Sequence, residues 1–547
     1  MTKDGSTPPL ARNIDAVIVG AGFSGMYMLH RLRAQGLSAI VFEAADDVGG
    51  TWYWNRYPGA RCDVESMQYS YSFSPELQQE WHWREIYAPQ PEILRYAQHV
   101  AERFDLRRDI RFATRVERAR FDRERLRWEI ATDRGDHVSA RYCIMATGCL
   151  SAAKLPEIAG CEKFRGATYH TGHWPHEGVD FSGRSVGVIG TGSSAIQAIP
   201  VIARDAKHVT VFQRTPNYSI PAHNRPMPPE YETMWKSHYP ELRARAWETR
   251  NGIVYDLNDQ SALAVDADER QRIYERRWAA GGIPFMAAFN DLIVNADANE
   301  TAAEFVREKI RAIVHDPETA AKLTPTSYPI GTKRICVDTD YFATFNRPNV
   351  SLIDVREHPI TAITETGVET AAGHYECDAL VFATGFDAMT GALNAITIDN
   401  GAGKSLRDKW AAGPRTYLGL MAAGFPNLFM ITGPGSPSVL SNMMVSIEQH
   451  VDWIARCLAT LDARGAAGIE ASEHAEENWV AHVNEVAYKT LYPAANSWYM
   501  GANVPGKPRV FMPYIGGVGV YREICEKIAA NGYEGFHLLP PVAAAAE

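Results

Sequence analysis

A stretch near the N-terminus has the residue types and the spacing that bind the phosphates of a dinucleotide. It reads Gly20-Ala21-Gly22-Phe23-Ser24-Gly25 and stands between a short apolar run and a helical pattern. The first glycine allows a tight turn, the second lets a pyrophosphate approach the backbone, and the third lets helix and strand pack closely. The next apolar run ends on Glu43, where a carboxylate can bond a ribose hydroxyl. The sequence therefore predicts a strand–turn–helix–strand unit that binds a dinucleotide.

A second stretch repeats this spacing but is followed by a different residue type. It reads Gly190-Thr191-Gly192-Ser193-Ser194-Ala195, and the strand predicted after it ends on Gln213-Arg214-Thr215 rather than on an acid. A carboxylate there would repel a 2′-phosphate, whereas a guanidinium binds one through bidentate, charge-assisted hydrogen bonds. Unless Arg214 is a solvated surface charge, this strand end predicts NADPH rather than NADH.

Two apolar strands that end in Ala-Thr-Gly indicate where the chain crosses between the two units. The first ends at Gly148 and the second at Gly385. Between them, residues 225–328 lose the glycine signals and show helical spacing. A chain of 547 residues is also too long for a single core. We expect an α/β fold with two Rossmann-like dinucleotide-binding domains and a helical insertion in the second.

The bulk composition excludes several classes of protein. The chain is 46% hydrophobic and 22% charged, with a net charge of −10 and no basic block, which argues against nucleic-acid binding. None of the eight cysteines forms Cys-x-x-Cys, so the sequence predicts neither a metal site nor a dithiol centre. Residues 1–10 lack the features of a signal peptide, and no apolar run reaches the ~20 residues that span a bilayer. We expect a cytoplasmic protein without membrane or nucleic-acid partners.

Between the two glycine stretches lies the pattern Phe164-x-Gly166-x-x-x-His170-x-x-x-Trp174-Pro175. With it, the sequence from about residue 14 to residue 540 resembles the class I Baeyer–Villiger monooxygenases. The resemblance implies FAD and NADPH as cofactors and the conversion of ketones to esters or lactones with oxygen. Residues 410–419 and 433–438 are most similar to the subgroup that includes phenylacetone monooxygenase.

The resemblance also assigns the two dinucleotides to domains. Residues 1–150 and 386–547 would form the FAD-binding domain, and residues 151–224 and 329–385 the NADP-binding domain. Residues 225–328 would be the helical insertion. The pattern at 164–175 would then be a linker between domains that move during the reaction cycle.

The resemblance gives roles to residues that are unremarkable by themselves. Arg334 matches the active-site arginine, and Asp63 the carboxylate that positions it; alone, the first is part of a Lys-Arg pair and the second a loop cap. The expected FAD contacts are Gly20, Gly22, Ser24, Gly25, Glu43, Thr51, Trp52, Tyr53, Trp54, Asp63, Tyr69, Val116 and Met443. The expected NADP contacts are Arg61, Cys62, Gly190, Thr191, Gly192, Ser193, Ser194, Ala195, Gln197, Arg214, Thr215, Lys333, Arg334 and Trp498.

The implied chemistry needs a fixed positive charge rather than a base. NADPH reduces the flavin, oxygen adds at flavin C4a as a peroxide, and a nearby guanidinium favours its anionic form. In the linker, Gly166 and Pro175 would fix turns, Phe164 and Trp174 would anchor by burial, and His170 would bond a neighbour rather than move protons.

Two other functions stay open at this point. A flavin-containing monooxygenase that oxidises sulfur or nitrogen shares the plan with two glycine stretches, although Trp174-Pro175 argues against it. A flavin-binding regulatory protein without turnover would leave Lys333 and Arg334 as solvated charges. We expect a monomer whose partners are O2 and a small ketone, either aryl, cyclic or bulky and polycyclic.

Overall fold

The larger of the two main sheets gathers strands from both ends of the chain. The computed structural model describes residues 11–541. Two of the eight strands come from beyond residue 390, so the chain returns to the sheet that it began. The order across it is β17 (Thr397–Asp399), β4 (Val116–Asp122), β5 (Arg127–Thr132), β6 (His137–Met145), β1 (Ala11–Val19), β2 (Ala39–Phe42) and β3 (Ile110–Arg111), with β18 (Leu428–Met430) also paired to β6.

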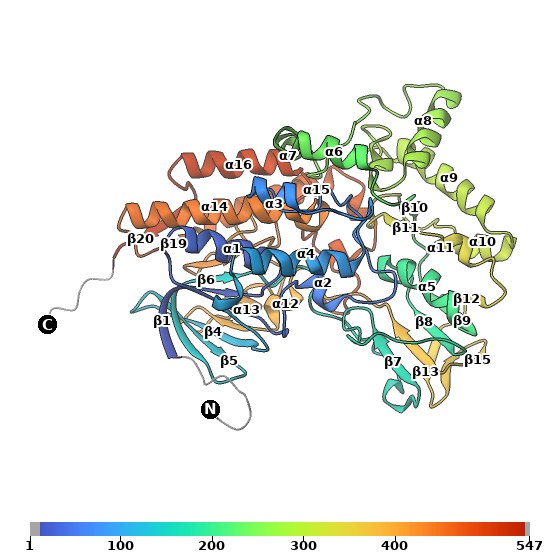
Figure 1. Ribbon diagram of the computed structural model, residues 1–547, viewed down its shortest axis with the longest axis horizontal. Coiled ribbons are helices and arrows are strands. Elements are labelled where there is room, and N and C mark those ends of the chain that lie inside the picture. The colour runs from blue at the N-terminus through green and yellow to red at the C-terminus, as the bar shows by residue number, and fades with distance from the viewer. Residues whose placement is uncertain (1–10, 542–547) are drawn as a thin grey trace.

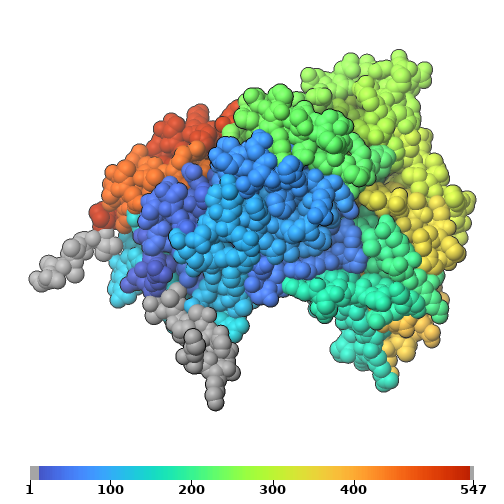
Figure 2. Space-filling model, viewed as in Figure 1, coloured from blue at the N-terminus to red at the C-terminus, as the bar shows by residue number. Residues whose placement is uncertain are grey.

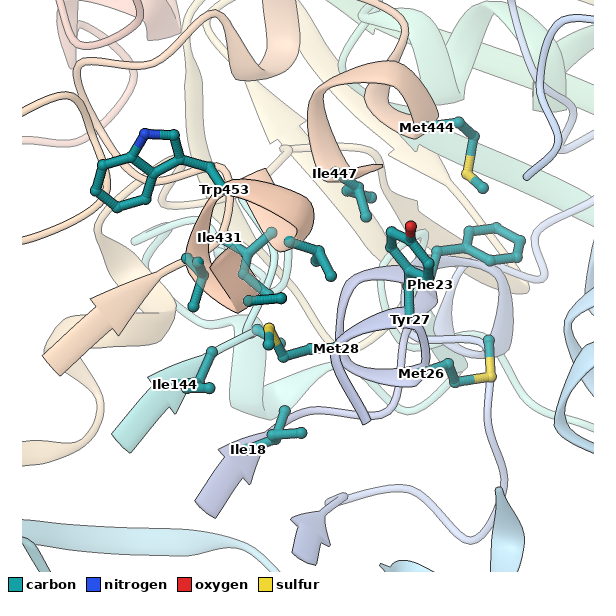
Figure 3. Packing of buried hydrophobic residues seen from close by; sticks show 14 of the residues in the cluster. Ile18, Phe23, Met26, Tyr27, Met28, Ile144, Ile431, Met444, Ile447 and Trp453 are labelled. Carbon is teal, nitrogen blue, oxygen red and sulfur yellow. The ribbon is translucent and has the colours of Figure 1, made fainter. Parts of the chain in front are cut away.

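The second half of strand β1, residues 16–19, is buried on both faces, which explains the continuous apolar run there. Ile18 packs with Ile144 beneath the helices α1 (Phe23–Ala34) and α14 (Met443–Ala463), as Figure 3 shows. Val17, the next residue along the pleat, points into a separate core on the opposite face that includes Trp128. The glycine turn between β1 and α1 is therefore held by two cores.

The second sheet is fully parallel and contains five strands. Their order is β12 (Val350–Asp354), β9 (His208–Gln213), β8 (Ser185–Ile189), β16 (Ala379–Phe382) and β7 (Ala167–His170). Helix α5 (Ser193–Asp205) follows β8 and packs with it in one core. These two sheets, each with a glycine turn after a buried strand, confirm the predicted α/β fold class (Figure 1).

The helices predicted as an insertion pack in two different places. Helices α6 (Pro229–Ser237) and α7 (Tyr239–Glu248) lie against the N-terminal segment, seen as green against blue in Figure 2. Arg243 of α7 donates there to the carbonyls of Gln68 at 2.7 Å and Met67 at 3.0 Å. In contrast, α8 (Ala267–Ala280), α9 (Ala296–Ile313) and α10 (Pro317–Leu323) join the core of the second sheet. The insertion therefore touches both parts of the molecule.

The two chain crossings lie side by side as a short antiparallel ribbon, which we call the crossing ribbon (residues 149–154 and 384–389). Lys154 N donates to the Gly385 carbonyl at 3.0 Å, and Asp387 N donates to the Ala152 carbonyl at 2.8 Å. A bridge between Ala153 and Phe386 completes the pairing. The only covalent connections between the two sheets within residues 11–541 are thus hydrogen-bonded to each other.

Membrane-crossing helices are not found within residues 11–541, because no helix there is both long and apolar enough. Residues 1–10, on which the expectation about a signal peptide depends, lie outside the described part. The remaining helices that contribute residues to the two cores of the first sheet are α2 (Thr51–Trp54), α3 (Pro75–Glu80), α4 (Gln90–Arg103), α12 (Gly391–Asn394), α13 (Leu406–Lys409), α15 (Glu473–Tyr488) and α16 (Val518–Ala530).

Candidate active site

The glycines of the first turn differ in what requires them. Gly20 has a φ of +103°, and a Cβ on it would lie 2.6 Å from the Ala146 carbonyl oxygen; a Cβ on Gly25 would lie 1.8 Å from the Gly20 oxygen. Both glycines are required by the fold itself. A Cβ on Gly22 would meet nothing nearer than Gly50 Cα, at an ordinary 3.5 Å. Gly22 therefore leaves space that a bound pyrophosphate would use.

Glu43, directly after β2, stabilises the glycine turn through hydrogen bonds to the backbone, and it also faces the expected ribose site. One carboxylate oxygen accepts from Ala21 N at 2.6 Å and the other from Ala45 N at 2.8 Å. Burial raises the pKa of Glu43, and these hydrogen bonds oppose that shift. Each carboxylate oxygen has a second acceptor site for a ribose hydroxyl. The sequence predicted the ribose role, whereas the support of the turn became visible only in the structure.

Helix α2, which carries four of the other expected FAD contacts, lies against the same turn. Helix α2 carries Thr51 to Trp54 and begins at Gly50, and a Cβ there would lie 2.9 Å from Gly22 Cα. Trp52 donates its indole N–H to the Tyr69 hydroxyl at 3.1 Å. Ser24 is buried in the first turn of α1, Val116 is buried at the start of β4, and Met443 begins α14. The structure thus places Met443 at the boundary with the cluster that contains Leu440.

The second glycine turn has the same build. Gly190 has a φ of +113°, and a Cβ on it would lie 2.5 Å from the Ala383 oxygen, whereas a Cβ on Gly192 would meet nothing within 4 Å. Thr191 donates its hydroxyl to the Thr215 carbonyl at 2.8 Å, which ties the turn to the end of β9. Ser193, Ser194 and Ala195 form the first turn of α5. The open space at Gly192 fits a second pyrophosphate.

Two cations stand beside this second turn. The Lys333 ammonium lies 4.5 Å from the centre of the Tyr328 ring. Burial, together with the nearby charge of Arg214, lowers the pKa of Lys333 to about 8. Two like charges held close together repel each other, and an anion such as a 2′-phosphate would relieve that repulsion.

Gln197, an expected NADP contact, makes its hydrogen bonds across the domain boundary. Its side-chain oxygen accepts from the Tyr57 hydroxyl at 2.8 Å, and its NH2 donates to the Arg61 carbonyl at 3.1 Å. A Cβ on Gly59 would lie 2.4 Å from the Gln197 carbonyl oxygen. Helix α5 therefore lies directly on the loop 57–63, which carries Arg61, Cys62 and Asp63.

Asp63 and Arg334 form a bidentate ion pair, although 271 positions separate them in the chain. Arg334 Nε donates to one carboxylate oxygen at 2.9 Å and Nη2 to the other at 2.8 Å, while Nη1 donates to the Val439 carbonyl at 2.8 Å. Burial, the largest single influence, lowers the pKa of Arg334, but the charge and hydrogen bonds of Asp63 together with smaller contributions raise it above its usual value. The guanidinium is therefore charged and fixed in orientation.

A cavity of about 170 Å³ lies beside Arg334, between the insertion and the C-terminal part of the chain. The sequence predicted Arg334 but missed most of its surroundings. The aromatic run that contains Tyr499 could have indicated a residue of the cavity wall. No pattern in the sequence marked Met286 and Phe289 of the insertion as lining residues. The apolar lining includes Met286, Phe289, Leu440, Tyr492, Tyr499 and Ile515.

The linker pattern lies on the second sheet and the crossing ribbon. His170 ends β7, accepts from Gly172 N at 2.9 Å through Nδ1, and places Nε2 3.2 Å from the Lys154 carbonyl oxygen. Burial lowers the pKa of His170, so the ring is neutral at pH 7. Its partners belong to the linker and the ribbon rather than to the pair of Arg334 and Asp63.

The other linker residues have structural surroundings. Trp174 is buried against Tyr169, and Phe164 packs partly buried in a small separate core. A Cβ on Gly166 would lie 2.5 Å from the Asp378 carbonyl oxygen, so this turn requires glycine. Pro175 follows Trp174 directly. These positions connect the linker to the second sheet.

Comparison with known proteins identifies the family. A family model described as pyridine nucleotide-disulphide oxidoreductase matches residues 17–231, which contain both glycine turns. A Baeyer-Villiger monooxygenase from Pseudooceanicola batsensis is 40% identical over 536 residues, covering 96% of this chain and 97% of the relative. This chain belongs to the Baeyer–Villiger monooxygenases. Its cofactors are FAD and NADPH, as predicted.

Two further similar proteins are monooxygenases with different names. The solved structure of an oxidized steroid monooxygenase bound to NADP is 54% identical, with a TM-score of 0.92, and covers 96% of this chain and 99% of that one. A phenazine N-monooxygenase from Lysobacter antibioticus is 41% identical over 530 residues, covering 96% of this chain and 97% of the relative. The family resemblance is confirmed, and the subgroup of phenylacetone monooxygenase stays a prediction.

Proposed function

We propose that this protein inserts one atom of O2 next to the carbonyl of a ketone, with NADPH as reductant, to give an ester or lactone. The observation that carries the proposal is the bidentate ion pair of Arg334 and Asp63 beside an apolar cavity. Bound FAD, once reduced by NADPH, supplies the activated oxygen. The chain supplies the fixed charge, the apolar pocket and the phosphate-binding turns.

Arg334 acts in this proposal through charge and position. A guanidinium does not lose its proton near neutral pH, so it can stabilise negative charge that develops on the carbonyl oxygen. Asp63 fixes the orientation of the guanidinium, and Nη1 of Arg334 donates a hydrogen bond to the Val439 carbonyl oxygen. Lys333 and Arg214 would hold the 2′-phosphate of NADPH.

The cavity favours an apolar ketone. Most of its described lining consists of aliphatic and aromatic side chains, and its two charged groups are Arg334 and Arg250. An aryl, cyclic or bulky polycyclic ketone would place its carbonyl near the guanidinium and bury its remaining surface. We further propose that the enzyme acts as a monomer in the cytoplasm, which size-exclusion chromatography and cell fractionation would test.

Oxidation of nitrogen is the second candidate, favoured by the similarity to a phenazine N-monooxygenase. That reaction needs no stabilisation of a carbonyl oxygen, so the two candidates differ in their need for Arg334. A panel of ketones, sulfides and aromatic amines, incubated with NADPH and air, separates them by product mass. N-oxides without any ester would favour the second candidate.

The decisive variant is Arg334→Ala. Loss of a preorganised charge at the reacting centre costs on the order of 10²–10³ in rate. We expect ester formation to fall by that factor while NADPH is still oxidised and hydrogen peroxide is released. Arg356→Ala is a matched control, because Arg356 also pairs with an aspartate but lies outside the cavity. Wild-type ester yield from Arg334→Ala would refute the proposed role.

A further inference from the structure

The aromatic segment 497–508 is attached to the crossing ribbon by an ion pair. The Lys507 ammonium donates to Asp387 Oδ1 at 2.6 Å and to the Ala388 carbonyl at 2.7 Å. The Lys507 side chain is only 10% exposed and that of Asp387 33% exposed. An ion pair this shielded is weakened less by salt than one at the surface.

Two further hydrogen bonds attach the same segment to both strands of the ribbon. Asn503 donates its side-chain N–H to the Phe386 carbonyl at 2.7 Å. From the other strand, the Lys154 ammonium donates to the Asn503 backbone carbonyl at 2.9 Å. The segment is therefore held at one end by Lys507 and in its middle by Asn503.

Lys154 also connects the segment to the linker pattern. Its backbone carbonyl oxygen lies 3.2 Å from His170 Nε2 and accepts from the Thr384 hydroxyl at 2.5 Å. Its side chain reaches Asn503 on the opposite side. One residue thus joins the linker, the ribbon and the aromatic segment.

The inner side of the segment forms part of the candidate active site. Tyr499 lines the cavity beside Arg334, and Tyr499 accepts through its carbonyl from Met512 N at 2.9 Å. Trp498, an expected NADP contact, is the neighbour of Tyr499 in the same turn. A shift of the segment relative to the ribbon would move both side chains.

We propose that Lys507, Asp387 and Lys154 are positioning residues that fix Trp498 and Tyr499 relative to the domain crossing. A change in the path of the ribbon would then shift these two aromatic residues relative to Arg334 and the cavity. The inference rests on the proposed function for the roles of Trp498 and the cavity. The attachment itself rests on the contacts described above.

The test compares Lys507→Met and Asp387→Asn with wild type by hydrogen exchange of residues 497–508, with and without NADP+. Breaking a shielded pair between an ordered segment and its support should speed exchange about tenfold. NADP+ affinity, measured by titration, should fall several-fold, while flavin content stays unchanged. Lys507→Arg keeps the charge and should restore both values.

Lys489→Met is the matched control, because Lys489 forms an exposed pair with Glu485 on α15. Its exchange over residues 497–508 should equal that of wild type. Unchanged exchange in both Lys507→Met and Asp387→Asn would overturn the proposal. Neither readout needs a ketone, so a wild-type enzyme that makes no ester contradicts the proposed function and leaves this test valid.

Discussion

Lys333 and Arg334 are consecutive residues with different partners. Arg334 is paired to Asp63 beside the cavity, whereas Lys333 lies over the Tyr328 ring near Arg214. The first cation has its charge balanced within the protein. The second shares its surroundings with another cation, and this arrangement is suited to an anionic ligand.

Arg214→Ala tests the choice of nicotinamide cofactor. Arg214 is exposed at the end of β9, where a 2′-phosphate would be reached by its guanidinium. We expect kcat/KM to fall by about tenfold or more with NADPH and to change little with NADH, since only NADPH carries the phosphate. An unchanged ratio of the two values would contradict the assignment of Arg214.

We predict that Lys333 makes NADP+ binding depend on pH. Its pKa of about 8 in the free protein would be raised by the 2′-phosphate, so the bound state holds its proton more firmly. Binding is therefore strongest below pH 8, and the Kd should rise up to about tenfold per pH unit above it. NAD+, which has no 2′-phosphate, is the control and should show a flat profile. A flat profile with NADP+ as well would exclude this role.

At the scale of elements, strand β7 and its terminal histidine support the crossing ribbon. His170→Ala removes the acceptor of Gly172 N and the contact with the Lys154 carbonyl. We expect more NADPH to be consumed per ester formed, because the ribbon loses a support that is separate from the cavity. The preferred ketone should not change. His374→Ala, in the exposed strand β15 (Gly373–Glu376), is the control.

A different result would change the role of the linker. If His170→Ala abolished ester formation but left the consumption of NADPH normal, His170 would resemble Arg334 in its effect. It would then belong to the reaction chemistry and not to the hinge. Measurement of ester, NADPH and hydrogen peroxide in the same sample distinguishes these outcomes.

For the whole molecule, the contact between α5 and the loop 57–63 links the two nucleotide sites. Tyr57→Phe removes only the hydroxyl that donates to Gln197. We expect flavin reduction by NADPH, followed anaerobically by rapid mixing, to slow several-fold with little change in NADPH affinity. Tyr274→Phe is the control, since Tyr274 bonds Thr301 within the insertion. Equal reduction rates for wild type and Tyr57→Phe would show that this contact does not set domain placement.

The sequence by itself determined the parts that depend on short stretches of chain. A strand, a glycine turn and a helix lie within one continuous segment, so the spacing of their residues alone predicts dinucleotide binding. Glu43 and Arg214 follow the same logic, since each ends the second strand of its unit. This is why two nucleotide-binding units and the preference for NADPH could be predicted from the residues, whereas FAD and the family were implied by the resemblance.

Only the tertiary structure decided which distant surfaces meet. The helical spacing of α6 and α7 predicts an apolar face but not the core that buries it, and these helices pack on the first domain. The contacts between Gln197 and Tyr57, and between Lys507 and Asp387, join residues far apart in the chain. The sequence does not identify such pairs, because many partners could satisfy the hydrogen-bonding capacity of one polar group equally well. The partner of each group is the one that the tertiary fold brings within hydrogen-bonding distance.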